Sequence, residues 1–181
     1  MKSIFDANFY FQFTPTNSKE LQSLLDKIIT PENDDPHAWS ANCLVETISL
    51  NAENWIHHIG PSLDIFSKHF NYSGRYEVSN PWINLYSKNG FQEIHDHYDC
   101  DMSAVFLLND GIDFARLYFY DRLSGVLNKS VRELIGYNSY YYPKLKAGDF
   151  IIFPSSTLHG VSPHKSKEIR KTFAFNFNLL K

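Results

Sequence analysis

Histidine is the residue type whose placement first suggests chemistry in this sequence. His95 and His97 stand two positions apart, as His95-Asp96-His97, at the end of a strand-like run. Side chains two positions apart on a strand share one face, so both imidazoles can reach a single ion. A third histidine, His159, follows a Gly-Asp turn and an apolar run. Borderline transition metals accept imidazole ligands, so the three histidines predict a metal site.

A second candidate feature is the polar face of the last predicted strand. Arg170 and Thr172 point to one side of it, and alternating phenylalanines point to the other. The strand predicted over residues 82–87 also has a polar face, because Asn84 and Tyr86 point to the same side. A small, polar face with one fixed positive charge is expected to look into water or into a polar cavity.

Two amphipathic helices are predicted before residue 80, over residues 17–29 and 52–70. Asn17 opens a motif of the capping-box type, and Asn51 is a plausible cap for the second helix. Pro61 predicts a kink or a break within that second helix.

The pattern of residue types changes after about residue 80, where short runs of aromatic and β-branched residues alternate with turn residues. These runs predict eight strands, over residues 82–87, 92–97, 103–108, 114–120, 137–145, 149–153, 158–161 and 170–179. Strands in series after two helices predict a compact antiparallel barrel or jelly roll with the helices against one sheet. We therefore expect a mainly β fold with N-terminal helices, in a single domain over 1–181. Its parts are a helical buttress over 1–79 and a β core over 80–181.

Composition excludes several classes of protein. The chain has 17 basic and 20 acidic residues and a net charge of −3, which disfavours a nucleic-acid partner. No apolar run reaches the roughly 18–20 residues of a membrane span, so no membrane partner is expected. The N-terminus lacks the pattern of a signal peptide. We expect a cytoplasmic location, with Cys43 and Cys100 as free thiols in a reducing cytosol.

Several motifs occur in a recognisable order. They are Trp82-Ile83-Asn84, Tyr86 with Gly90, His95-x-His97, residues 103–108, Gly148-Asp149 through residues 153–155, His159, and Arg170-x-Thr172. In this order and spacing the sequence resembles the iron(II)- and 2-oxoglutarate-dependent dioxygenases. It looks closest to the prolyl-4-hydroxylase-like branch and to the 2OG-Fe(II) oxygenases seen in bacteria and their viruses. The resemblance covers roughly residues 80–179.

The resemblance implies a double-stranded β-helix, a cupin-like jelly roll of two facing sheets with iron at the open end. Fe(II) would be held by His95, His97 and His159. The remaining coordination positions would face the keto acid, dioxygen and the substrate.

The resemblance also implies 2-oxoglutarate as co-substrate, with its far carboxylate on Arg170, since a guanidinium matches a carboxylate bidentately. Thr172 and Tyr86 would add hydroxyl donors, and Asn84 would line the same cavity. The implied reaction couples decarboxylation of 2-oxoglutarate to succinate with oxidation, most simply hydroxylation, of a small-molecule or peptidyl substrate. Arg116 is a second candidate for the anion partner.

The ligand set departs from the usual pattern of these enzymes, which is His-x-Asp. In register with Tyr86 and Gly90, position 97 carries histidine, whereas a literal His-x-Asp occurs at His97-Tyr98-Asp99. On a strand, positions 95, 97 and 99 all point to the same face, so the alternation of side chains does not choose between the two ligand sets. We favour His95, His97 and His159, with His97, Asp99 and His159 as the alternative.

Two rival functions stay open on the sequence. One is a cupin-type metal-dependent enzyme that does not use 2-oxoglutarate, because Gly148, Pro154 and His159 partly match a cupin motif. The other is a metal-free β-barrel binding module whose tyrosines provide stacking surfaces. Arg170 favours the oxygenase, because a cupin has no general need for a cation there. The oligomeric state, a homodimer included, also stays open.

Overall fold

The computed structural model describes residues 9–29 and 43–181. The helices are α1 (Ser18–Ile28), α2 (Ala52–Phe70), the 3-10 helix η1 (Arg122–Gly125) and α3 (Lys129–Ile135). The strands are β1 (Phe11–Phe13), β2 (Glu46–Ser49), β3 (Arg75–Val78), β4 (Trp82–Tyr86), β5 (Gln92–His95), β6 (Met102–Leu107), β7 (Leu117–Tyr120), β8 (Tyr140–Tyr141), β9 (Phe150–Pro154), β10 (His159–Val161) and β11 (Arg170–Leu180).

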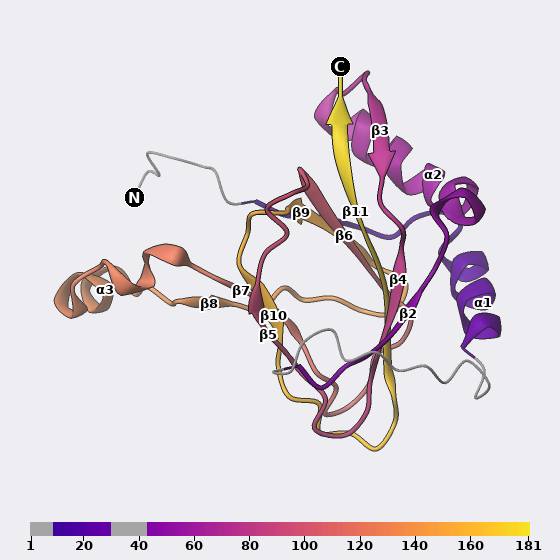
Figure 1. The fold of residues 1–181 in the computed structure, drawn as a ribbon. Coiled ribbons are helices and arrows are strands. Elements are labelled where there is room, and N and C mark those ends of the chain that lie inside the picture. The colour runs from indigo at the N-terminus through magenta and orange to yellow at the C-terminus, as the bar shows by residue number, and fades with distance from the viewer. Residues whose placement is uncertain (1–8, 30–42) are drawn as a thin grey trace.

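Two antiparallel sheets face each other (Figure 1). The larger has the order β1-β9-β6-β11-β4-β2, and β3 pairs with the C-terminal end of β11. The smaller has the order β5-β10-β7-β8. Successive core strands mostly alternate between the sheets, which is the double-stranded β-helix expected from the sequence. Within the described residues the sheets remain separate, so the expected barrel is not closed by hydrogen bonds.

The hydrophobic core lies between the larger sheet and the two long helices. Phe173, Phe175 and Phe177 of β11 are at most 1% exposed and form the aromatic face predicted for this strand. The ring of Trp55 in α2 lies 5.5 Å from that of Phe173, and Phe66 lies 5.6 Å from Phe177. Each such side chain contributes roughly 1.5–3 kcal/mol by leaving water. This packing directs the opposite, polar face of β11 into the space between the sheets.

The part of the chain before residue 80 is more than the helical buttress that was expected. It also contributes β1, β2 and β3, which extend the larger sheet by pairing with β9, β4 and β11. Asn17 occupies the N-cap position of α1 as predicted, but its side chain makes no capping hydrogen bond; its Nδ2 instead donates to the His58 carbonyl at 2.9 Å and joins α1 to α2. Asn51 does cap α2, by accepting from the Glu53 amide at 2.9 Å. Helix α2 continues through Pro61 without a break.

The predicted core strands are present, and most of them are shorter than expected. The strand expected over 92–97 ends at His95, and that expected over 137–145 is reduced to the two residues of β8. The sequence analysis missed η1 and α3, which lie between β7 and β8. The segment that contains η1 and α3 projects from the side of the molecule (Figure 1), and α3 buries none of its residues.

The cysteines and the helices bear on two further expectations, free thiols and the lack of a membrane span. Cys43 and Cys100 are both free thiols. No helix in the described ranges is long and apolar enough to cross a bilayer.

Candidate active site

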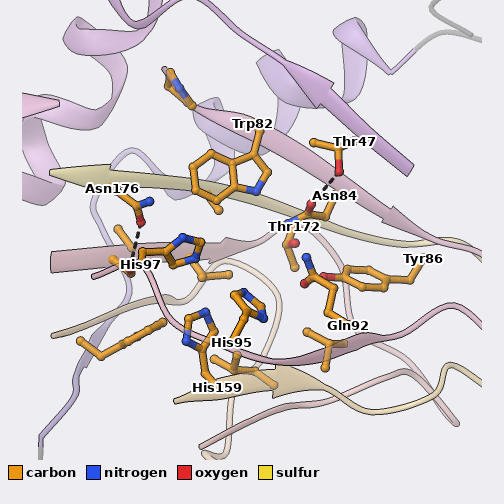
Figure 2. A pocket seen from close by; sticks show the side chains of 18 of the residues that line it. Thr47, Trp82, Asn84, Tyr86, Gln92, His95, His97, His159, Thr172 and Asn176 are labelled. Atoms are coloured by element: carbon orange, nitrogen blue, oxygen red, sulfur yellow. Dashed lines mark hydrogen bonds between the residues drawn. The ribbon is translucent and has the colours of Figure 1, made fainter. Parts of the chain in front are cut away.

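The three histidines predicted as metal ligands come together between the sheets (Figure 2). One ligand nitrogen from each of His95, His97 and His159 lies within 4.8 Å of the other two. The closest rings are those of His95 and His159, whose centroids are 4.3 Å apart. These two residues are cross-strand partners, because the last residue of β5 pairs with the first of β10. His97 lies beyond β5, where its backbone N–H donates to the Ser155 carbonyl at 2.9 Å.

Hydrogen bonds orient two of the three rings. The Nδ1 of His95 donates to the Glu93 carbonyl at 2.7 Å, and the Nδ1 of His159 donates to the Thr157 carbonyl at 2.9 Å. A ring that donates through Nδ1 keeps its Nε2 unprotonated, with a lone pair for a metal ion. The backbone therefore selects the tautomer that can bind a metal.

Burial also keeps the cluster uncharged. It lowers the pKa of His95, and it lowers that of His97 to about 4 with a further contribution from the nearby His95. The pKa of His159 falls to about 3, first through burial and then through the charge of His95. All three imidazoles are neutral near pH 7, which is the form that binds metals.

The alternative ligand set, which consists of His97, Asp99 and His159, is not assembled. Among the described residues, the group that could hold a metal ion contains the three histidines and not Asp99. Asp96, which stands between the two neighbouring histidines, forms an ion pair with Arg122 at the start of η1. The geometry therefore favours His95, His97 and His159.

Arg170 borders the same cavity, on β11 opposite Tyr86 of β4. It is only 3% exposed, its Nη1 has no hydrogen-bond partner, and its guanidinium lies 4.7 Å from the centre of the Tyr86 ring. In the part of the chain that the structure describes, no carboxylate pairs with it. Burial lowers the pKa of Arg170, against the opposing influence of Tyr86. An unpaired buried cation is costly, so this position suits an anionic ligand.

The other residues predicted to bind the co-substrate line the cavity beside Arg170. Thr172 pairs with Asn84, one step along the strands from the pair of Arg170 and Tyr86. The Oδ1 of Asn84 accepts from the Thr47 hydroxyl at 3.2 Å (Figure 2). Burial raises the pKa of Tyr86 to about 12, so its hydroxyl stays protonated near pH 7.

The cavity has a volume of about 310 Å³, within the range of small-molecule sites. Arg116, the other candidate for the anion partner, does not line it. Its side chain is exposed, stacks 4.7 Å from the centre of the Tyr142 ring, and lines a neighbouring cavity that Arg170 and Leu117 also border. Arg170 is thus the only fixed charge among the described residues that line the histidine cavity.

Sequence reasoning did not assign to this cavity several side chains that line it, among them Trp82, Gln92, Asn80 and Thr47. Trp82 could have been found, because it has the same strand parity as Asn84 and Tyr86. Gln92 accepts a hydrogen bond from the Tyr86 hydroxyl. Thr47 gave no signal, because it lies in a four-residue strand within the part of the chain expected to be helical.

The fold and the site define a double-stranded β-helix protein with a candidate metal centre of three imidazoles beside a buried arginine. Residues 80–176 match the family described as "Putative 2OG-Fe(II) oxygenase", and the chain belongs to this family. The family implies Fe(II) and 2-oxoglutarate as cofactor and co-substrate. A comparison with curated proteins found no match.

Solved structures with the same fold include several such oxygenases. A Pseudomonas putida prolyl-4-hydroxylase is similar with a TM-score of 0.67 and 14% identity, over 94% of this chain and 92% of that one. A Burkholderia pseudomallei oxidoreductase of the 2OG-Fe(II) oxygenase family has a TM-score of 0.66 and 12% identity, over 93% and 84%. HygX from Streptomyces hygroscopicus, crystallised with nickel and 2-oxoglutarate, has a TM-score of 0.67 and 12% identity, over 97% and 84%. These likenesses concern the fold.

Proposed function

We propose that this protein is a 2-oxoglutarate-dependent non-haem iron dioxygenase that hydroxylates its substrate. 2-Oxoglutarate would be decarboxylated to succinate, and dioxygen would be the second co-substrate. The observation that supports this most directly is the buried guanidinium of Arg170. Its Nη1 lacks a partner, and it borders the same cavity as three neutral imidazoles. A keto acid with a carboxylate at each end fits a cavity that offers a cation at one end and metal ligands at the other.

The side chains present fit both groups. Three neutral imidazole nitrogens suit a borderline divalent metal and leave other coordination positions open. Arg170 would bind the far carboxylate through two parallel N–H···O bonds, which would satisfy its orphaned Nη1. His95, His97 and His159 would hold the iron, as expected from the family resemblance.

The protein's own part in the reaction would be binding and orientation. Thr172 would donate its hydroxyl to the carboxylate beside Arg170. Tyr86 would hold the guanidinium plane by stacking, with its own hydroxyl fixed by Gln92. Burial excludes water from this end of the cavity, and the low dielectric strengthens the ion pair. When bound, the iron and the keto acid supply the oxidising chemistry that side chains lack.

The ligand set carries a consequence for charge. Three imidazoles contribute no negative charge, whereas a His-x-Asp set contributes one. The near carboxylate of the keto acid would therefore offset part of the double charge of the metal, while the far carboxylate pairs with Arg170, so co-substrate and metal should bind cooperatively. The substrate would be a small molecule or a peptidyl residue.

The test is an anaerobic titration of the purified protein with Fe(II) and 2-oxoglutarate. We expect a visible metal-to-ligand charge-transfer band that needs both additions, and release of succinate once air is admitted. Iron binding without the band would indicate a cupin-type enzyme that does not use the keto acid. Absence of stoichiometric iron binding would indicate a binding module. Either result would refute the proposed function.

A further inference from the structure

The cavity extends beyond the part that the co-substrate would fill. Paired residues of β4 and β11 form successive steps along its wall: Arg170 with Tyr86, Thr172 with Asn84, and Ala174 with Trp82. Neighbouring steps are about 7 Å apart, because residues on one face are two positions apart. The step at Trp82 is therefore roughly 14 Å from that at Arg170. A five-carbon acid held by Arg170 does not reach it, so this outer half is left for the substrate.

Trp82 forms one wall of the outer half and lies next to the histidine cluster (Figure 2). Its ring centroid is 6.0 Å from that of His97. Its cross-strand partners, Ala174 and Ser49, are both small. The indole is only half-buried, so it offers an apolar surface on which a ring-shaped ligand can stack.

Amide groups in the outer half are set to donate hydrogen bonds. The Oδ1 of Asn176 accepts from the Ser103 hydroxyl at 2.8 Å, and Ser103 is itself within 2.9 Å of the Ser155 hydroxyl. The Oδ1 of Asn80 accepts from the backbone N–H of Ala52 at 3.1 Å. Each amide oxygen already accepts one hydrogen bond, so the two donors of each NH₂ group are the larger part of what these residues can offer to a ligand. A ligand with oxygen acceptors would use these donors.

The outer half carries no formal charge. Of the described residues that line the cavity, none is a carboxylate, and the one fixed cation, Arg170, lies at the other end. A charged ligand group near Trp82 would lose its hydration without gaining a counter-charge. The features of this half therefore match a ligand that is neutral, ring-shaped and rich in oxygen.

We propose that the substrate is a neutral carbohydrate whose ring stacks on Trp82 and whose oxygens accept hydrogen bonds from Asn176 and Asn80; this rests on the proposed function. A sugar ring offers aliphatic C–H bonds, which a nucleobase ring lacks. A prolyl ring has C–H bonds but no ring oxygens, so it would leave the amide donors without partners. In the reaction, one oxygen atom of O₂ converts a C–H bond to C–OH. The other enters succinate as 2-oxoglutarate loses CO₂.

The test measures succinate formation by the Fe(II)-loaded protein in air with each of several probes. The probes are glucose, galactose, mannose and N-acetylglucosamine, with a proline-containing tripeptide and the free base thymine for comparison. We expect at least one sugar to accelerate succinate formation and to yield a product heavier by one oxygen atom. The peptide and the nucleobase should have no such effect.

Substitutions at Trp82 connect this effect to the stacking surface. Trp82→Ala should raise the sugar concentration needed for half-maximal stimulation roughly tenfold, the energy of one aromatic contact. Trp82→Phe, which keeps a ring and is less prone to unfold, should raise it less. Tyr140→Ala is the matched control, because it removes a tyrosine that is 42% exposed and does not line the cavity.

The outcomes separate this inference from the proposed function. If the charge-transfer band forms but no sugar stimulates succinate formation, or only the peptide or the nucleobase does, the carbohydrate assignment is overturned and the oxygenase stands. Equal responses of Trp82→Ala and Tyr140→Ala would also overturn it. If the band does not form, the proposed function fails, and the substrate assignment fails with it.

Discussion

Replacing Arg170 with methionine should have two effects of opposite sign. Methionine keeps much of the length of the side chain but removes its charge and its donors. If Arg170 anchors the keto acid, the variant should bind 2-oxoglutarate much more weakly. Because the guanidinium is 3% exposed and its Nη1 has no partner, the ligand-free variant should also be more stable than the natural protein.

Both magnitudes follow from the surroundings of Arg170. Two charge-assisted hydrogen bonds in a buried site are worth about 3–5 kcal/mol together, so affinity should fall about 10²–10⁴-fold. Removing an uncompensated buried charge should stabilise the fold by about 2 kcal/mol. Loss of the stacking on Tyr86, at 4.7 Å, offsets about 1 kcal/mol of this. A net gain of about 1 kcal/mol corresponds to a Tm about 2–4 °C higher in a chain of this size.

The assay is the anaerobic charge-transfer titration, together with thermal unfolding in the presence and absence of 2-oxoglutarate. Arg116→Met is the matched control, because it removes an exposed arginine that does not line the histidine cavity, and it should leave the affinity unchanged. If Arg116→Met weakens binding and Arg170→Met does not, the anchor is Arg116. A lower Tm for ligand-free Arg170→Met would mean that the fold already compensates the charge of Arg170, and it would refute the description of this guanidinium as an unpaired buried cation.

Four further substitutions test the metal site and the fold. His95→Ala should weaken Co(II) or Fe(II) binding by more than about 100-fold, whereas Asp99→Ala should leave it nearly unchanged, and the reverse would support the alternative ligand set. Arg122→Ala breaks an exposed ion pair to Asp96, so it should cost less than about 1 kcal/mol in denaturant unfolding but lower metal affinity up to about tenfold. Equal metal affinities would show that this contact does not position the ligands. Gly148 has a φ of 87°, and an added methyl would lie 2.6 Å from a serine hydroxyl of α1. Gly148→Ala should therefore lower the free energy of unfolding by about 1–3 kcal/mol, and an unchanged Tm would contradict this.

Period-two alternation was the reliable signal for the β core. It separated the buried phenylalanines of β11 from Arg170 and Thr172, because neighbouring side chains on a strand must point to opposite faces. The same rule would have added Trp82 to the site, since it shares a parity with Asn84 and Tyr86. Helical spacing likewise located α1 and α2, whose apolar residues pack on the larger sheet.

Short elements and loop contacts escaped prediction, because their stability comes from partners distant in the sequence. The strand β2 has only four residues and is defined by its pairing with β4. The position of Thr47 in the cavity could therefore not be predicted from local sequence. Asn17 is of a residue type that favours the N-cap, yet its side-chain amide donates a hydrogen bond to the carbonyl of His58, 41 residues away. The helix α3 has apolar residues at helical spacing, Val131, Leu134 and Ile135, but with only seven residues it is too short for this periodicity to identify it.

The sequence by itself determined which side chains could share a face: the histidine pair, the polar face of β11, and the aromatic face behind it. These are local consequences of backbone geometry. Only the tertiary structure decided that His159 meets His95 across two paired strands, that Asp99 stays outside the cluster, and that Arg170 is the cation in the cavity. Strand parity is the same for positions 95, 97 and 99, so the choice among them depends on where β5 ends and on the burial of each side chain. Both are set by contacts between segments that lie far apart in the chain.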